Sequence, residues 1–319
     1  MRGGASGSEP SPRSSAGWHA ALELGFDVER GATRLGRRSH RGPLVVQRPF
    51  FPEGDAVCHV YVLHPPGGLV GGDELDVSLE VDAGAHALVT TPAAAKIYRT
   101  AGAQVRQTQR LRVAAGGVLE WLPQESIVFD GAHATAETRV ELSPGARFIG
   151  ADAVCFGRPA GNAPFARGYC RQLFELRRDG RPLLIERGRY DAGGLVGRAR
   201  WGLGGAGVLA LFVTAPAPAA DAVEAVRALA AAASDASGAG GDICGVTVVG
   251  DGDGSCLVAR YLGHAAERTR DFVQTAWRLV RPSLLGRDAV PPPRMGDMRR
   301  VERRPALPAA VHRGRLGTL

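Results

Sequence analysis

Two stretches of this chain alternate strictly between apolar and polar residues. In residues 75–82 the apolar side chains occupy every odd position and Asp, Ser, Glu and Asp lie between them, and residues 105–113 repeat the pattern with arginine and threonine on the polar side. A period of two places all the apolar residues on one face of an extended strand. The sequence therefore predicts sheets with one face in a core and the other in water.

Further strands are predicted through the first two thirds of the chain. They are residues 57–63, 86–91, 118–122, 135–142, 171–177, 182–190 and 207–214. Short turn sequences lie between them, such as Asp82-Ala-Gly84 and Ser143-Pro-Gly145, and such turns favour an antiparallel arrangement. We expect a mainly β fold, a two-layer β-rich scaffold of β-helix-like or sandwich type, with a small C-terminal helical cap.

The pattern changes after Pro218. Apolar residues at helical spacing predict helices over 221–233 and 265–280, the second ending before Pro282. Two strands, 243–249 and 255–261, are predicted between them. The apolar stripes of these helices, beside a glycine-rich β body, predict exposed surface for another protein and aggregation of the isolated chain.

Charge is concentrated at the two ends of the chain. The 319 residues have a formal net charge of +7, but residues 18–280 carry 28 basic and 28 acidic side chains. We expect a disordered lead over 1–17, one β-rich domain over 18–294 and a disordered basic tail over 295–319. The neutral body argues against nucleic acid as a partner.

Cysteine usage and hydropathy indicate the compartment. The five cysteines are widely spaced, with no Cys-x-x-Cys pair, which is typical of a reducing compartment. The N-terminus lacks the apolar core of a signal peptide, and no apolar run approaches the roughly 20 residues of a membrane-spanning helix. We therefore expect a cytoplasmic protein without a membrane partner.

A glycine-rich element occupies residues 64–73, His-Pro-Pro-Gly-Gly-Leu-Val-Gly-Gly-Asp. A phosphate-binding loop would contain Gly-Lys-Ser or Gly-Lys-Thr and lead into a helix, whereas this element leads into the alternating strand after Asp73. A structural turn and a functional loop are about equally compatible with these residues.

Four carboxylates lie in apolar or glycine-rich surroundings. They are Asp73, Glu125, Asp152 and Glu186. Such a group needs a hydrogen-bond donor, an arginine, water or a metal, and structural pairing is the more frequent case. Lys96 is the only lysine among 39 basic residues, which hints at a specific need for an ammonium group.

Five motifs in order carry a resemblance to a known family. They are HPPGGLVGGD at 64–73, TTPAAAKIYR at 90–99, WLPQESIVFD at 121–130, CFGR at 155–158 and LVRPSLLGR at 279–287. Over residues 18–294 the chain resembles the UreD (UreH) urease accessory proteins. Members of this family usually finish with a short aromatic ending, whereas here Arg294 is followed by Met-Gly-Asp and the basic tail.

The resemblance implies a role and a set of partners. It implies a non-catalytic chaperone or scaffold that joins UreF and UreG on apo-urease and assists nickel insertion, with Ni²⁺ passing transiently and no tightly bound cofactor. A passing metal needs weak oxygen ligands, since thiolate or imidazole sites would retain it. The expected nickel path comprises Asp73, Thr90, Thr91, Glu125, Asp152 and Glu186.

Two other functions remain open on the residues alone. A β-rich hydrolase that attacks polysaccharide would need two carboxylates about 5–10 Å apart, although the chain is sparse in the aromatic residues that stack on sugars. RNA binding by the basic tail would show a steep salt dependence.

Overall fold

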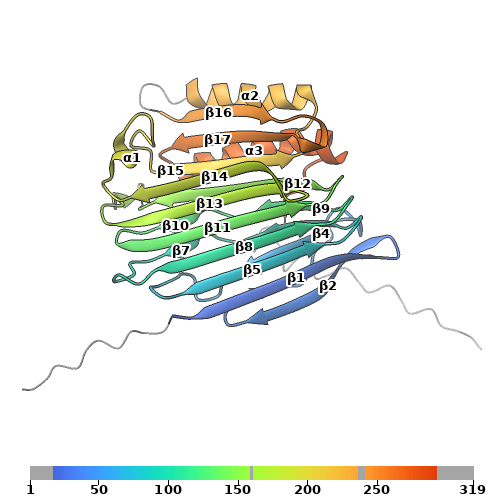
Figure 1. Ribbon diagram of the computed structural model, residues 1–319, viewed down its shortest axis with the longest axis horizontal. Helices are drawn as coiled ribbons and strands as arrows, with labels where there is room; N and C mark the ends of the chain where they lie inside the picture. Colours follow the sequence, from blue (N-terminus) through green and yellow to red (C-terminus); the bar gives the residue numbers. More distant parts are fainter. Residues whose placement is uncertain (1–16, 159–160, 236–240, 293–319) are drawn as a thin grey trace, which may run out of the picture.

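The computed structural model describes residues 17–158, 161–235 and 241–292. Its strands form two facing sheets that run the length of the molecule (Figure 1). The seven-stranded sheet has the order β14-β13-β11-β8-β5-β1-β2. Its strands are β1 (His19–Glu29), β2 (Ala32–Arg41), β5 (Glu74–Val81), β8 (Val105–Val113), β11 (Ala132–Leu142), β13 (Gly168–Arg178) and β14 (Arg181–Asp191).

The second sheet has ten strands and follows the order β16-β17-β15-β12-β9-β6-β4-β3, with β10 and β7 attached beside β12. Its strands are β3 (Val45–Val46), β4 (Cys58–Leu63), β6 (His86–Thr90), β7 (Ala95–Ile97), β9 (Val118–Leu122), β10 (Ser126–Val128), β12 (Arg147–Phe156), β15 (Val208–Ala215), β16 (Ile243–Val249) and β17 (Cys256–Gly263). The mainly β, two-layer fold is confirmed, with the stacking of a β-solenoid.

The strand direction predicted from the turns is wrong for most of the body. β5, β8, β11 and β13 pair parallel in one sheet, and β4, β6, β9 and β12 pair parallel in the other. The short turns after β5, β8 and β11 carry the chain across to the facing sheet instead of back along the same one. The next strand of a given sheet therefore arrives after a full coil and runs in the same direction.

Glycines make these crossings possible. Gly84, Gly116 and Gly145 have φ between 69° and 74°, in the left-handed region that glycine adopts without a steric penalty. Successive turns are also joined to one another, since the amide of Val118 donates to the Ala85 carbonyl at 2.8 Å and that of Arg147 to the Gly117 carbonyl at 2.9 Å. The stacked turns after β5, β8 and β11 thus form one long edge of the solenoid.

The N-terminal hairpin is absent from the expected strands. β1 and β2 pair antiparallel around Arg30 and Gly31, both with positive φ. Ala20, Leu22, Leu24 and Phe26 alternate along β1 and are at most 1% exposed, so the period-two signal was present there. β1 then pairs parallel with β5 and extends the core by one layer.

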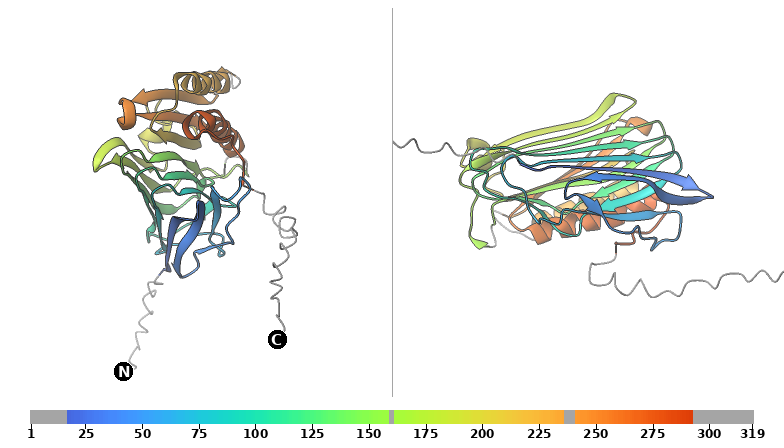
Figure 2. Two further views of the ribbon diagram at one scale, coloured as in Figure 1. Left: turned by 90° about the vertical axis from the view of Figure 1, so that its right-hand side faces the viewer. Right: turned by 90° about the horizontal axis from the view of Figure 1, so that it is seen from below.

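The described helices are α1 (Leu195–Arg198), α2 (Ala220–Asp235) and α3 (Ala266–Leu285), and a 3-10 turn spans Gly252–Gly254. Of these, α2 and α3 cover the outer face of the ten-stranded sheet (Figure 2). The apolar stripes of α2 and α3 pack against this sheet, with Val226 and Val280 fully buried. They are therefore covered by the chain itself, and the expectation that they form free surface is wrong.

α3 also runs past the predicted stop at Pro282. The helix ends at Leu285 with Gly286 in the left-handed conformation, and the Gly286 amide donates to the Pro282 carbonyl at 2.9 Å. Proline removes one backbone hydrogen bond, but burial of Arg281 and Leu284 holds the last turn against the sheet.

A buried charged cluster fixes α3 to the sheet. Its members are Glu53, His59, His86, Glu120, Trp277 and Arg281. The Arg281 guanidinium donates to Glu120 at 3.0 Å and to Glu53 at 2.8 Å, and the Trp277 indole N–H donates to Glu120 at 2.6 Å. Burial alone would raise the pKa of Glu120, but the hydrogen bonds and charges of His86 and Arg281 outweigh it and hold this pKa below its usual range.

The expected lead and tail fall almost wholly outside the described residues, as does most of the loop after α2. Among the described helices, none combines the length and hydropathy needed to cross a bilayer.

Candidate functional site

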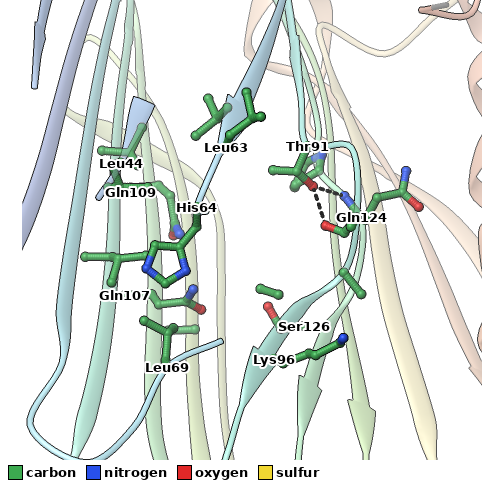
Figure 3. A pocket seen from close by; sticks show the side chains of 18 of the residues that line it. Leu44, Leu63, His64, Leu69, Thr91, Lys96, Gln107, Gln109, Gln124 and Ser126 are labelled. Carbon is green, nitrogen blue, oxygen red and sulfur yellow. Dashed lines mark hydrogen bonds between the residues drawn. The ribbon is translucent and has the colours of Figure 1, made fainter. Parts of the chain in front are cut away.

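A cavity of about 280 Å³ lies between the two sheets (Figure 3). The seven-stranded sheet contributes inward residues of β5, β8 and β11, and the ten-stranded sheet contributes residues of β4, β9, β10 and β12. Such a space holds several water molecules, since one water needs roughly 10–15 Å³ on this measure. The solenoid is therefore not packed solid between its sheets.

The cavity wall carries polar groups supplied by facing strands. Asp152 of β12 is the only carboxylate that the described residues contribute to its wall, and Gln107, Gln109 and Thr138 lie on the opposite sheet. The Thr138 hydroxyl donates to the Gln109 side-chain oxygen at 3.1 Å. These are neutral oxygen donors around a single acid.

Asp152 is surrounded by protein but partly open to the cavity. Burial raises its pKa to about 6, and a hydrogen bond from Gln172 partly opposes this shift. The Gln172 Oε1 atom is itself buried without a hydrogen-bond partner in the described structure. A buried oxygen of this kind has its full capacity available for a cation or a water molecule.

The mouth of the cavity combines the glycine-rich element with two loops. His64 and Leu69 lie on one side of the cavity, and Lys96, Thr91 and Gln124 lie across from them (Figure 3). Burial lowers the pKa of His64, and the charge of Asp73 opposes this effect. His64 is therefore biased toward its neutral form, in which one ring nitrogen is an acceptor.

A second cavity of about 640 Å³ lies on the other face of the ten-stranded sheet, under α3. We call it the outer cavity, and the cavity between the two sheets the inner cavity. Both cavities are lined by Thr91, Pro92, Pro123 and Gln124. The Gln124 amide donates to the Thr91 hydroxyl at 2.9 Å and closes this shared wall. The two loops after β6 and β9 are thus all that separates the two spaces at this point.

Four of the six expected path residues lie along these cavities. Thr90, Thr91 and Glu125 line the outer cavity, Thr91 also lines the inner one, and Asp152 lies inside it. Thr90 donates to the Leu122 carbonyl at 2.6 Å, and Glu125 accepts from Arg270 at 2.9 Å. In the part of the chain that the structure describes, each of the two cavities is lined by one carboxylate, Asp152 in the inner cavity and Glu125 in the outer one.

Asp73 and Glu186 line neither cavity. The Asp73 carboxylate accepts from the backbone amides of Trp18 and Val70 at 2.9 and 2.8 Å, so it fastens the glycine-rich turn. Glu186 of β14 pairs with Arg260 of β17 and so joins the edge strand of one sheet to the facing sheet. The arginine partners of Glu125 and Glu186 thus come from a distant helix and a distant strand, not from neighbours in the sequence.

Sequence reasoning missed the uncharged part of the site. Gln107 and Gln109 occupy inward positions of β8, where Val105 and Leu111 are buried core residues. Polar residues at apolar positions of an alternating strand are the signal that could have identified them. Thr138 lies two residues before the buried Val140 on β11, and Gln172 lies between the buried Cys170 and Phe174 on β13, so both interrupt apolar positions in the same way. Only the pairing of the sheets shows that they lie opposite Asp152.

The buried carboxylate of Asp152 lowers the free energy of unfolding when it is ionised. We therefore expect the effect of removing it on stability to depend on pH. Its folded-state pKa of about 6 lies above the ordinary value, so the free energy of unfolding falls as the pH rises from about 4 to 6. Asp152→Asn should therefore raise the free energy of unfolding at pH 7.5 by on the order of 2 kcal/mol.

Urea unfolding of the full chain at pH 7.5 and pH 4 measures this difference, which should vanish at pH 4. An equal effect of the substitution at both pH values would show that burial does not raise the pKa of Asp152 in the folded protein.

Comparison with known proteins agrees with the extent of the fold. The family model described as UreD urease accessory protein matches residues 19–296. A protein of Azoarcus sp. (strain BH72), "Urease accessory protein UreD", is 46% identical over 282 residues, which cover 86% of this chain and 93% of the relative.

Two further relatives with the same description come from other bacteria. Those of Pseudomonas entomophila (strain L48) and Dechloromonas aromatica (strain RCB) are each 42% identical and cover 88% of this chain and 95% of their own length. The matched range corresponds to the region in which the five motifs lie. The chain therefore belongs to the UreD family of urease accessory proteins, and its role lies in urease maturation.

Proposed function

We propose that this protein is a cytoplasmic, non-catalytic scaffold that joins UreF and UreG on apo-urease. In this proposal Ni²⁺ is a cargo that passes through the outer and inner cavities. The observation that carries the proposal is the placement of Thr90, Thr91, Glu125 and Asp152 along two cavities that share one loop wall.

The donor set supports passage of a metal ion over retention. The described lining of the inner cavity has one carboxylate, amide and hydroxyl oxygens, His64 and the single ammonium group of Lys96, and none of the five cysteines lines either cavity. Among the described residues there is no group of three or more His, Cys, Asp or Glu side chains that could hold a metal. Weak and sparse ligands allow a borderline cation such as Ni²⁺ to exchange.

Asp152 supplies a negative charge to the inner cavity. With a pKa of about 6 its carboxyl group is mostly ionised at neutral pH, although burial disfavours the charged form. A cation close to the carboxylate favours this ionised form further. The burial cost of the carboxylate is therefore reduced when a cation lies beside it.

The proposal is tested by urease maturation with variants of the full chain. Asp152→Asn removes the one carboxylate that the described residues place in the inner cavity, so we expect an unchanged yield of the complex with UreF, UreG and apo-urease but a several-fold lower nickel content of the urease. Metal analysis of purified urease and the yield of the complex are measured side by side.

Asp73→Asn is the matched comparison. The asparagine side chain keeps one acceptor oxygen, so one of the two bonds to the Trp18 and Val70 amides is lost, which should lower the yield of the folded complex with nickel per complex retained. A normal yield with normal nickel in Asp152→Asn would contradict the path through the inner cavity, and failure of the unmodified chain to bind any of the three proteins would contradict the scaffold.

The polysaccharide hydrolase receives no comparable support. Both glycosidase mechanisms need a pair of carboxylates, and each cavity is lined by one. Cleavage of a glycan panel by the purified chain would favour the hydrolase instead.

A further inference from the structure

The connection between β14 and β15 forms a lobe of fixed shape. This α1 lobe, residues 191–207, lies at the end of the molecule opposite the stacked turns (Figure 1). Three backbone hydrogen bonds of 2.8 Å fold it on itself, from the amides of Ala199, Leu203 and Gly205 to carbonyls of residues 195–197. Leu203 is 9% exposed and anchors the lobe to the core. The lobe is therefore a built element and not an open loop.

The α1 lobe turns its largest apolar side chains outward. Trp201 is 72% exposed and Leu195 is 64% exposed, the two highest values among the large hydrophobic residues of the described structure. A groove of about 370 Å³ lies beside them, with Phe156, Phe165 and Leu203 in its wall. Exposed tryptophan beside an apolar groove is typical of the centre of a protein interface.

Five exposed arginines lie in the α1 lobe or at the adjoining ends of β13 and β14. They are Arg167, Arg171, Arg189, Arg198 and Arg200. Arg171 and Arg189 lie 5.3 and 4.9 Å from the centre of the Tyr169 ring, which holds their guanidinium groups in place.

Two of the five arginines already have acidic partners. Arg189 pairs with Asp191 and Arg167 with Asp130. Arg171, Arg198 and Arg200 form no ion pair with any residue of the described ranges. The charge of Arg171 also acts on Asp191, so the uncompensated charge is that of Arg198 and Arg200, which complements a surface of opposite sign.

We propose that the α1 lobe and its five arginines form the docking surface for a protein partner that presents carboxylates around an apolar pocket for Trp201. The chain's own termini do not meet this description, since residues 293–319 carry seven arginines and two acidic residues and residues 1–16 carry two arginines and one. A second copy would place arginines against arginines across a two-fold axis. Nucleic acid would gain little from Leu195 and the apolar groove, and two of the arginines are already neutralised.

This assignment rests on the proposed function in one respect, since its partner is sought among apo-urease, UreF and UreG. Binding of the full chain to each of the three is measured separately. Trp201→Ala should weaken binding to one of them by at least about 30-fold. Arg198→Glu with Arg200→Glu should weaken binding to the same protein and reduce the dependence of its association rate on salt.

Matched control variants lie at the opposite edges of the two sheets, away from the α1 lobe. Trp18→Ala removes another exposed tryptophan, 60% exposed, at the start of β1. Arg38→Glu with Arg48→Glu makes the same change of net charge near β2 and β3, at the sheet edges opposite β14 and β16. Both sets should leave the affinity within about twofold of the unmodified chain.

The possible failures are distinguishable. An unmodified chain that binds none of the three proteins contradicts the proposed function and this assignment with it. Binding that the Trp201 and Arg198/Arg200 variants leave unchanged contradicts the docking surface alone. These variants could also lose self-association, or binding to single-stranded RNA or to anionic phosphatidylserine vesicles, with unchanged binding to the three proteins. That result assigns the surface to another occupant and also contradicts the proposed docking surface.

Discussion

Replacement of Arg281 by methionine should be the most damaging single substitution in the helical part of this protein. Arg281 is fully buried and is the only arginine in the buried charged cluster, where it bonds to both Glu53 and Glu120. Its removal leaves two buried carboxylates without their cation, and breaking a buried pair in this way costs about 3–5 kcal/mol. That is a large share of the total stability of an ordinary domain.

Urea unfolding of the full chain and the yield of soluble protein measure the effect. Arg278→Met is the matched control, because Arg278 lies three residues earlier on α3 and is exposed, so its loss should change the free energy of unfolding by no more than about 0.5 kcal/mol. Equal effects of the two substitutions would show that the cluster does not fix α3.

The pH dependence gives a second test of the same cluster. In the unmodified chain the pKa values of Glu53 and Glu120 are lowered, so the stability that they contribute is present at neutral pH and is lost as the pH falls below the ordinary glutamate value. Without Arg281 burial dominates and favours the protonated acids. The difference in stability between Arg281→Met and the unmodified chain should therefore shrink from pH 7 to pH 5.

Gly168→Ala should disrupt the parallel stacking of the solenoid. Gly168 begins β13 with φ of 95°, and a Cβ atom there would lie 2.1 Å from the carbonyl oxygen of Ala132, its partner on β11. Because the obstructing atom belongs to the backbone, the strands must separate or shift. Overpacking and the left-handed conformation together should cost about 2–5 kcal/mol.

Gly180→Ala separates the two causes. Gly180 has φ of 71°, but a Cβ atom there meets nothing within 4 Å, so only the conformational penalty of about 1 kcal/mol applies. Thermal unfolding of both variants decides the matter. If they lose equal stability, close approach of β11 and β13 does not limit the residue at position 168.

The local patterns of the sequence determined most of the elements. Alternation in residues 75–81 and 105–113 identified β5 and β8, and the helical spacing after Pro218 identified α2 and α3. These assignments succeed because one face of each element must be apolar to be buried, whatever lies opposite. The family likewise followed from the sequence, since its motifs are contiguous runs of residues.

The direction of the strands was decided by the tertiary structure. Asp82-Ala-Gly84 has the same residues whether it reverses the chain within one sheet or carries it across to another, because the local φ and ψ requirements are satisfied in both cases. The contrast between alternating β5 and fully buried β6 was the one sequence signal for a crossing, since strands covered on both faces read as continuous apolar runs.

The chemistry of the site was likewise determined in part by the sequence and in part by the tertiary structure. The sequence identified Asp152 as an acid in apolar surroundings, but Gln107, Gln109 and Gln172 became its neighbours only when strands of the facing sheet were set opposite β12. It also marked Asp73 and Glu186 as equivalent to Asp152, whereas the fold gave them backbone amides and Arg260 as partners. A carboxylate's partner is set by which strands and helices come within about 3 Å of it, and residues distant in the sequence supply that contact.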